Sequence, residues 1–113
     1  ETSGDKPVFN GKEVQGARWL FSEGSERPTY VDGTRWWLLL GFNPGYQRYL
    51  PTNPSLVEPN SYLYFGTYNL VRESVRIEVQ QAVTVAGYVD AGRFTWDQNR
   101  IYDNAGSAIY LQR

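Results

Sequence analysis

The sequence contains no cysteine, no histidine and no methionine. Without cysteine the chain has no disulfide and no thiol nucleophile, and without histidine it lacks the commonest general base and metal ligand. These absences remove the groups on which most nucleophilic and metal-assisted catalysis depends. We therefore expect a protein that is not an enzyme and that carries no metal or other cofactor.

The sequence also lacks a strong net charge and a long hydrophobic run. Its 11 Lys and Arg residues nearly balance 12 Asp and Glu residues, for a formal net charge of -1. Such a balance creates no field that attracts polyanions, so nucleic acid is not favoured as a partner. The longest apolar run, residues 36–40, is far shorter than the ~20 residues of a membrane-spanning helix.

Aromatic residues, in contrast, are abundant, with nine Tyr, five Phe and four Trp among 113 residues. Each can bury about 150 to 250 Å², and a chain of this length forms one domain. We expect a flexible leader over residues 1–12, where the composition is polar, and a single domain over residues 13–113. Trp19, Phe94 and Trp96 alternate with polar neighbours, so we expect them in the core.

Residues 61–70 have the pattern of a central strand. The two alternating sets are Tyr62, Tyr64, Gly66, Tyr68 and Leu70 on one side and Leu63, Phe65, Thr67 and Asn69 on the other. A strand places such sets on opposite faces, and here both faces are at least partly apolar. We also expect Gly66 to let a neighbouring side chain or strand approach the backbone closely.

Further strands are predicted along the chain, separated by turn signals. They cover residues 16–21, 35–42, 46–50, 75–80, 81–89, 93–97, 99–102 and 107–112. The Asn43-Pro44-Gly45 turn should join two of them as a hairpin, and the prolines of residues 51–59 predict an ordered loop. Hairpin-length connections and the absence of helical periodicity predict an all-β fold, a small antiparallel up-and-down barrel of about eight strands.

Several of these stretches resemble a known family when taken in order. They are Gly16-Ala17-Arg18-Trp19, Leu39-Leu40-Gly41-Phe42, Gly66-Thr67-Tyr68-Asn69-Leu70, Val75-Arg76-Ile77 and Gly106-Ser107-Ala108-Ile109-Tyr110-Leu111. Over residues 14–113 the chain resembles the small bacterial lipocalin-like and META-type lipoprotein domains. The resemblance implies a lipocalin-like barrel that binds an apolar ligand or serves as an accessory protein of the cell envelope.

The candidate ligand-binding residues are aromatic side chains and one arginine: Trp36, Trp37, Tyr62, Tyr64, Tyr68 and Arg48. The tyrosines and tryptophans could line an apolar cup, with phenol hydroxyls and Arg48 orienting an amphipathic ligand. The alternative is that the aromatic residues are simply core. If residues 35–42 are a strand, Trp36 and Trp37 point to opposite faces, so one of them must leave the core and offer a contact surface.

Other reactive patterns are weaker. Glu73 with Glu78, or Asp90 with Asp97, could in principle act as acid and base, but nothing separates them from ordinary charged turns. Residues 97–101 begin like a calcium loop, yet Ile101 occupies the place of a required oxygen ligand. Neither pattern alters the expectation of a protein without catalytic residues or a metal site.

We therefore expect a binding module for a small apolar or amphipathic molecule. The alternatives are a structural or interaction protein of the cell envelope, contacting a protein partner or a second copy through an exposed aromatic strand, and a carbohydrate-binding aromatic platform. We expect an exported protein of the bacterial periplasm or cell envelope. Its contact with the membrane would be a lipid anchor ahead of Glu1.

Overall fold

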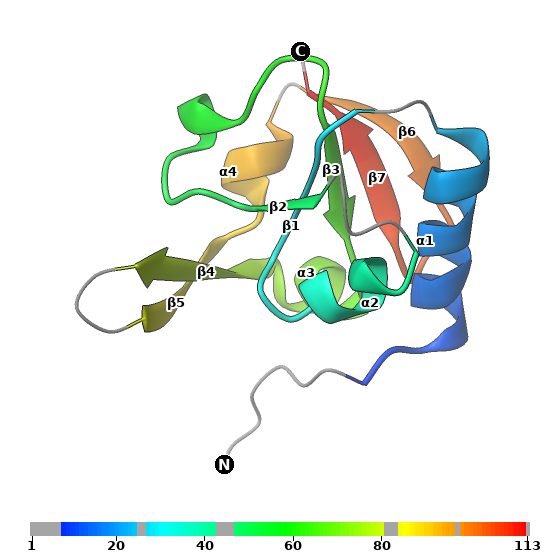
Figure 1. The fold of residues 1–113 in the computed structure, drawn as a ribbon, viewed down its shortest axis with the longest axis horizontal. Helices are drawn as coiled ribbons and strands as arrows, with labels where there is room; N and C mark the ends of the chain where they lie inside the picture. Colours follow the sequence, from blue (N-terminus) through cyan, green and yellow to red (C-terminus); the bar gives the residue numbers. More distant parts are fainter. Residues whose placement is uncertain (1–7, 25–26, 43–46, 81–83, 97, 113) are drawn as a thin grey trace.

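The computed structural model describes residues 8–24, 27–42, 47–80, 84–96 and 98–112. Its elements are α1 (Gly11–Glu23), β1 (Thr29–Val31), α2 (Trp36–Leu40), β2 (Gln47–Tyr49), the 3-10 helix η1 (Pro54–Leu56), β3 (Tyr62–Phe65), α3 (Thr67–Arg72), β4 (Ser74–Gln80), β5 (Thr84–Asp90), α4 (Gly92–Thr95), β6 (Asn99–Asp103) and β7 (Ala108–Leu111). Five strands form a sheet in the order β2-β1-β3-β7-β6, and β4 pairs with β5 alone (Figure 1).

The predicted all-β barrel is wrong. The fold is mixed α/β, and its five-stranded sheet is open rather than closed. β1 runs parallel to both β2 and β3, whereas β7 is antiparallel to β3 and β6. Parallel neighbours require crossover connections, so an up-and-down meander is excluded.

α1 replaces the strand predicted at residues 16–21. The Asn10 side chain accepts a hydrogen bond from the backbone N–H of Glu13, and the Glu13 carboxylate accepts one from the backbone N–H of Asn10. This capping box starts the helix at Gly11, inside the predicted leader. The buried positions of α1 are Glu13, Gly16, Ala17 and Leu20. Their spacing of three or four residues defines one helical face.

α2 replaces the strand predicted at residues 35–42. A short, continuous apolar run does not distinguish a strand from a buried helix, and here Leu38 and Leu39 are buried on the inner side of a single helical turn. The predicted hairpin to residues 46–50 is therefore wrong. β2 does form within that range, but it pairs with β1 in parallel. The turn predicted at residues 43–45 lies outside the described residues.

β3 is the central strand of the sheet, as predicted, over residues 62–65. Tyr62 and Tyr64 pack on one face and Leu63 and Phe65 on the other, so both faces are apolar. The strand then ends earlier than predicted. Gly66 is the N-cap of α3, and this helix occupies the second half of the predicted strand.

Two cores lie on the two faces of the sheet. The helix-side core consists of Ala17, Leu20, Val31, Leu38, Leu39, Tyr62, Tyr64 and Ile109. The hairpin-side core consists of Tyr30, Leu50, Val57, Leu63, Phe65, Val75, Ile77, Ala91 and Phe94. The first core joins α1 and α2 to the sheet, and the second joins β4 and α4 to it.

The C-terminal half is closer to the prediction. β4 and β5 form a hairpin, although residues 81–83 lie outside the described residues. The β6–β7 hairpin is confirmed. The strand predicted at residues 93–97 is instead α4, which buries Phe94 and leaves the Trp96 side chain 82% exposed. Phe94 thus belongs to the core as expected, Trp19 is half-buried against Tyr102, and Trp96 does not belong to the core.

Candidate functional site

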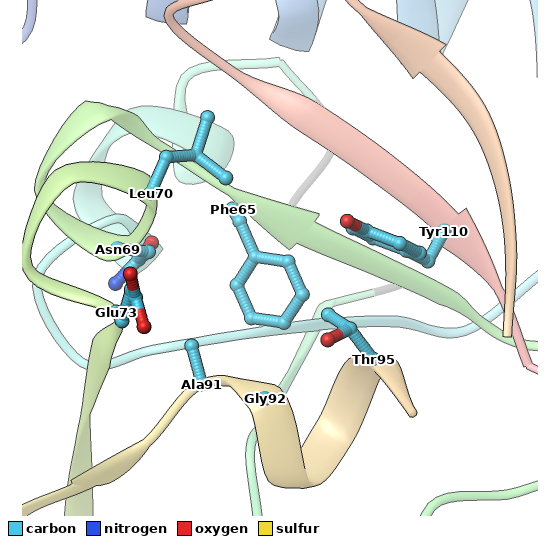
Figure 2. A pocket seen from close by; sticks show the side chains of 8 residues that line it. All are labelled: Phe65, Asn69, Leu70, Glu73, Ala91, Gly92, Thr95 and Tyr110. Atoms are coloured by element: carbon cyan, nitrogen blue, oxygen red, sulfur yellow. The ribbon is translucent and has the colours of Figure 1, made fainter. Parts of the chain in front are cut away.

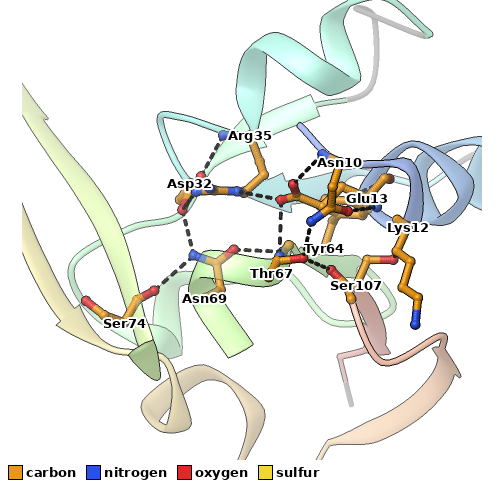
Figure 3. A network of polar contacts seen from close by, with 12 residues as sticks. Asn10, Lys12, Glu13, Asp32, Arg35, Tyr64, Thr67, Asn69, Ser74 and Ser107 are labelled. Atoms are coloured by element: carbon orange, nitrogen blue, oxygen red, sulfur yellow. Dashed lines mark hydrogen bonds and ion pairs between the residues drawn. The ribbon is translucent and has the colours of Figure 1, made fainter. Parts of the chain in front are cut away.

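A buried ion-pair network lies between α1, α2 and α3 (Figure 3). Arg35 is 2% exposed. Its Nη1 lies 3.0 Å from Asp32 Oδ2, and its Nε lies 3.3 Å from Glu13 Oε2. The backbone N–H of Arg35 also donates to Asp32 Oδ1 at 2.7 Å, which starts the turn before α2. A buried charge is stable only when it is paired and hydrogen-bonded, and all three charged groups meet this condition.

Glu13 connects this network to α3. Its Oε1 accepts from Asn10 in the capping box, while its Oε2 accepts from the backbone N–H of Thr67 at 3.1 Å, at the start of α3. The hydroxyl of Thr67 receives a hydrogen bond from Asn10 Nδ2 and donates one to the carbonyl of Gly106. The two helix starts and the β6–β7 turn are thus held together.

Gly66 makes this close approach possible, as the sequence predicted. A Cβ atom at this position would lie 2.0 Å from Glu13 Oε2 and 2.9 Å from Arg35 Nε. The backbone of Gly66 is extended, so any residue could adopt its dihedral angles. Glycine is required here by the space that the ion pair occupies.

Asn69 carries the network from the ion pairs to the hairpin side of the molecule. Its amide group donates to Asp32 Oδ2 at 2.7 Å and to the carbonyl of Ser74 at 2.9 Å. Its Oδ1 accepts from the backbone N–H of Gly66 at 2.8 Å. With these contacts the side chain of Asn69 has one fixed orientation, and α3 is anchored at both ends.

Tyr64 closes the network against α1. Its hydroxyl donates to the carbonyl of Glu13 at 2.6 Å. Burial raises the pKa of Tyr64 far above the ordinary value, and the negative charge of Glu13 adds to the effect. Gly16 of α1 lies beside the Tyr64 ring. A Cβ atom at this position would clash with Ser107 Oγ, so only glycine fits there. The network is therefore an interior brace, which positions α3 but is not itself open to a ligand.

A cavity of about 230 Å³ lies on the opposite side of α3 (Figure 2). It is lined by Phe65, Asn69, Leu70, Glu73, Ala91, Gly92, Thr95 and Tyr110. Figure 2 shows Phe65 in the middle, with the side chains of α3, α4 and β7 around it. The rings of Phe65 and Tyr110 meet edge to face, with centroids 5.7 Å apart. Apolar walls with a few polar groups are typical of small-molecule sites.

No family model, curated protein or solved structure matches the chain. The resemblance to lipocalin-like and META-type domains stays a prediction, and the open sheet removes the barrel that it implied.

The predicted ligand-binding residues on α2 and β2 lie at the surface. Trp37 is 62% exposed, whereas Trp36 is half-buried and stacks on Tyr49 with centroids 4.1 Å apart. Arg48 is exposed, and its Nη1 donates to the carbonyl of Gln47. One tryptophan does leave the core as expected, although a helix rather than a strand separates the two side chains.

The three predicted tyrosines are distributed over two elements. Tyr62 and Tyr64 are buried in the helix-side core, and Tyr64 belongs to the brace. Tyr68 is half-buried on α3, with the Arg35 guanidinium carbon 5.7 Å from its ring centroid and the Tyr88 ring 6.0 Å away. None of the six predicted residues lines the cavity, so the structure does not gather them into one site.

Of the other reactive patterns, the structure describes the side chain of one member of each carboxylate pair. Glu73 lines the cavity, while Asp90 is exposed and accepts a hydrogen bond from the backbone N–H of Gly92. Asp97 lies outside the described residues, as do the details of the Glu78 side chain. Within the ranges that the structure describes, no three metal-ligating side chains gather, and no helix is long and apolar enough to span a membrane.

Proposed function

We propose that this protein is a binding module that holds a compact, partly apolar molecule in the cavity between β3, α3, α4 and β7. The observation that carries the proposal is the cavity itself, which has an apolar floor and a polar rim. Its volume of about 230 Å³ is below the roughly 300–1,000 Å³ of common ligand sites, which favours a small ligand.

The chemistry of the lining favours binding over catalysis. Among the lining residues that the structure describes, Glu73 is the only carboxylate, so these residues offer no acid and base pair. The amide of Asn69 is engaged with Asp32, Ser74 and Gly66 and cannot turn toward a reacting group without breaking those contacts. The proposal is therefore a module without enzymatic activity.

The rigidity of the cavity walls supports the same proposal. Phe65 is 1% exposed on the central strand, and the backbone N–H of Ala91 donates to the carbonyl of Glu73 at 2.9 Å, which ties α4 to the end of α3. A site whose walls are already held in place loses little conformational entropy on binding. A small ligand with few contacts needs that advantage.

Backbone amide NMR with a library of small neutral and charged compounds tests the proposal. Compounds that bind should shift the amide signals of Leu70, Ala91 and Tyr110 first. Ala91→Leu should abolish these shifts, because Ala91 has helical dihedral angles that leucine accepts and its Cβ points toward Phe65 (Figure 2). Trp37→Ala is the matched control and should bind unchanged. Shifts that persist in Ala91→Leu would contradict the proposal.

A second candidate is an interaction protein of the cell envelope. It is favoured by exposed apolar side chains on α2, directly after it and on the edge strand β2: Trp37, Leu40, Phe42 and Tyr49. Exposed aromatic residues are enriched where proteins meet. The exported location expected from the sequence stays a prediction under both candidates.

A further inference from the structure

Glu73 gives the cavity its charge. It is the only charged side chain among the described lining residues, and it stands beside Asn69 at the rim (Figure 2). Within the part of the chain that the structure describes, no hydrogen bond or ion pair engages its carboxylate. Asn69, next to it, has its polar atoms fully engaged in the brace. The carboxylate of Glu73 is thus the charged group that the described lining offers to a ligand.

The backbone of Glu73 is also unusual. This residue ends α3 in the left-handed conformation, with φ 53° and ψ 41°. Glycine, or sometimes asparagine, is favoured at such a position because a side chain adds strain. The backbone conformation ends α3 at the cavity and gives a reason to test the side chain of Glu73 separately from its backbone.

The remaining lining residues suit the apolar part of a cation. Phe65 and Tyr110 place two aromatic rings in the cavity, and these rings offer a large apolar contact surface. Within the described ranges no Lys or Arg lines the cavity, and Arg72 and Arg93, its neighbours along the chain, are exposed. An anionic ligand would therefore meet the Glu73 carboxylate without a compensating positive charge.

We propose that the ligand of this cavity is a small organic cation, an ammonium group on a compact apolar body. The ammonium group pairs with Glu73 at the rim, and the apolar body contacts Phe65, Leu70 and Tyr110. This inference rests on the proposed function, since it assigns a ligand class to the same cavity.

Three compounds of matched size test it: benzylamine, which is a cation, benzyl alcohol, which is neutral, and benzoate, which is an anion. They are titrated into the whole 113-residue chain while the amide signals of Leu70, Ala91 and Tyr110 are followed. Benzylamine should bind up to about fivefold more tightly than benzyl alcohol, as expected for one exposed ion pair. Added salt should reduce this preference without weakening the binding of benzyl alcohol.

Two variants assign the preference to the carboxylate. Glu73→Gln should bring benzylamine to the affinity of benzyl alcohol. Glu73→Gly should do the same while it raises the melting temperature, since glycine relieves the left-handed backbone. A purely structural glutamate would change the melting temperature but not the ratio of the two affinities.

The outcomes separate the ligand class from the binding function. Equal affinities of benzylamine and benzyl alcohol at these amides, or tighter binding of benzoate, would overturn the cation class and leave the cavity as a binding site. A preference that survives in Glu73→Gln would overturn the role of Glu73. If none of the three compounds shifts these amides, both the ligand class and the proposed function fail.

Discussion

Replacing Gly66 by alanine should destabilise the fold through one defined contact. The added Cβ would lie 2.0 Å from Glu13 Oε2, far inside the van der Waals distance, and 2.9 Å from Arg35 Nε. The backbone of Gly66, with φ -96° and ψ -172°, is accessible to alanine. The cost is therefore steric and electrostatic, not conformational.

The magnitude follows from what must move. Overpacking in a well-filled interior costs about 1 to 3 kcal/mol. If the Glu13 carboxylate is pushed away from Arg35, the cost approaches the roughly 3 to 5 kcal/mol of a broken buried ion pair. We expect about 2 to 4 kcal/mol. A domain of this length has a stability of roughly 6 to 17 kcal/mol at 0.05–0.15 kcal/mol per residue, so the variant should still fold.

Urea unfolding followed by tryptophan fluorescence measures the free energy of unfolding. Gly87→Ala is the matched control, because nothing lies within 4 Å of the Cβ that it would add. It should change stability by less than about 0.5 kcal/mol. In a Glu13→Ala background the clash partner is gone, so Gly66→Ala should cost at least about 1 kcal/mol less than it does alone.

Two results would refute this reasoning. If Gly66→Ala is as neutral as Gly87→Ala, the ion pair does not occupy the space above Gly66. If the cost of Gly66→Ala is unchanged in the Glu13→Ala background, the strain arises elsewhere and Glu13 is not its cause.

The remaining predictions concern α2 and the brace. Leu39→Ala should cost about 2 to 5 kcal/mol because Leu39 is fully buried, whereas Trp37→Ala on the same helix should cost less than about 0.5 kcal/mol in the monomer. Light scattering should show weaker self-association of Trp37→Ala if the interaction candidate is right, and equal costs in urea unfolding would contradict the placement of α2. The unfolded chain releases the Tyr64 proton near its ordinary pKa of 10.0 while the folded chain retains it, so stability should fall as pH rises above about 10. In urea unfolding, the stability of the Tyr64→Phe variant should fall less steeply with pH between about pH 9 and about pH 11 than that of the unchanged protein. Identical slopes of stability against pH would show that Tyr64 is not buried as described.

The parts of the fold that the sequence predicted depend on strand alternation. In β3 both alternating sets are apolar, and a central strand between two cores is the arrangement that buries both. The β6–β7 hairpin was found from the turn at residues 103–106, where Asp103 and Asn104 side chains accept hydrogen bonds from following backbone N–H groups.

The helices were missed because a short segment can fit both the alternation of a strand and the periodicity of a helix. Residues 16–21 alternate like a strand, and the decisive signal for α1 lies earlier, in the capping pair Asn10 and Glu13. In α2 every residue is apolar, so the sequence shows no hydrophobic periodicity that could separate a helix from a strand. A search for capping boxes would have identified α1, but nothing local distinguishes α2.

The cavity could not have been found from local patterns. Phe65, Ala91 and Tyr110 come from three segments that only the tertiary fold brings together. Glu73 was noted only as one of several charged turn residues, because its left-handed backbone has no signature in the sequence. The brace was missed because its members are far apart in the sequence: Glu13 and Asn69 are 56 positions apart and are linked in the fold through Arg35 and Asp32.

The position of β7 in the sheet affects how the protein is made. β7 follows the other described strands in the sequence, yet it lies between β3 and β6 inside the sheet. While the chain is being synthesised, β1, β2 and β3 can assemble first, and β3 then presents an unpaired edge until residues 108–111 leave the ribosome. A nascent chain that stalls before this point would carry β3, whose four residues are all buried in the folded protein, as an open edge that is prone to pair with another chain.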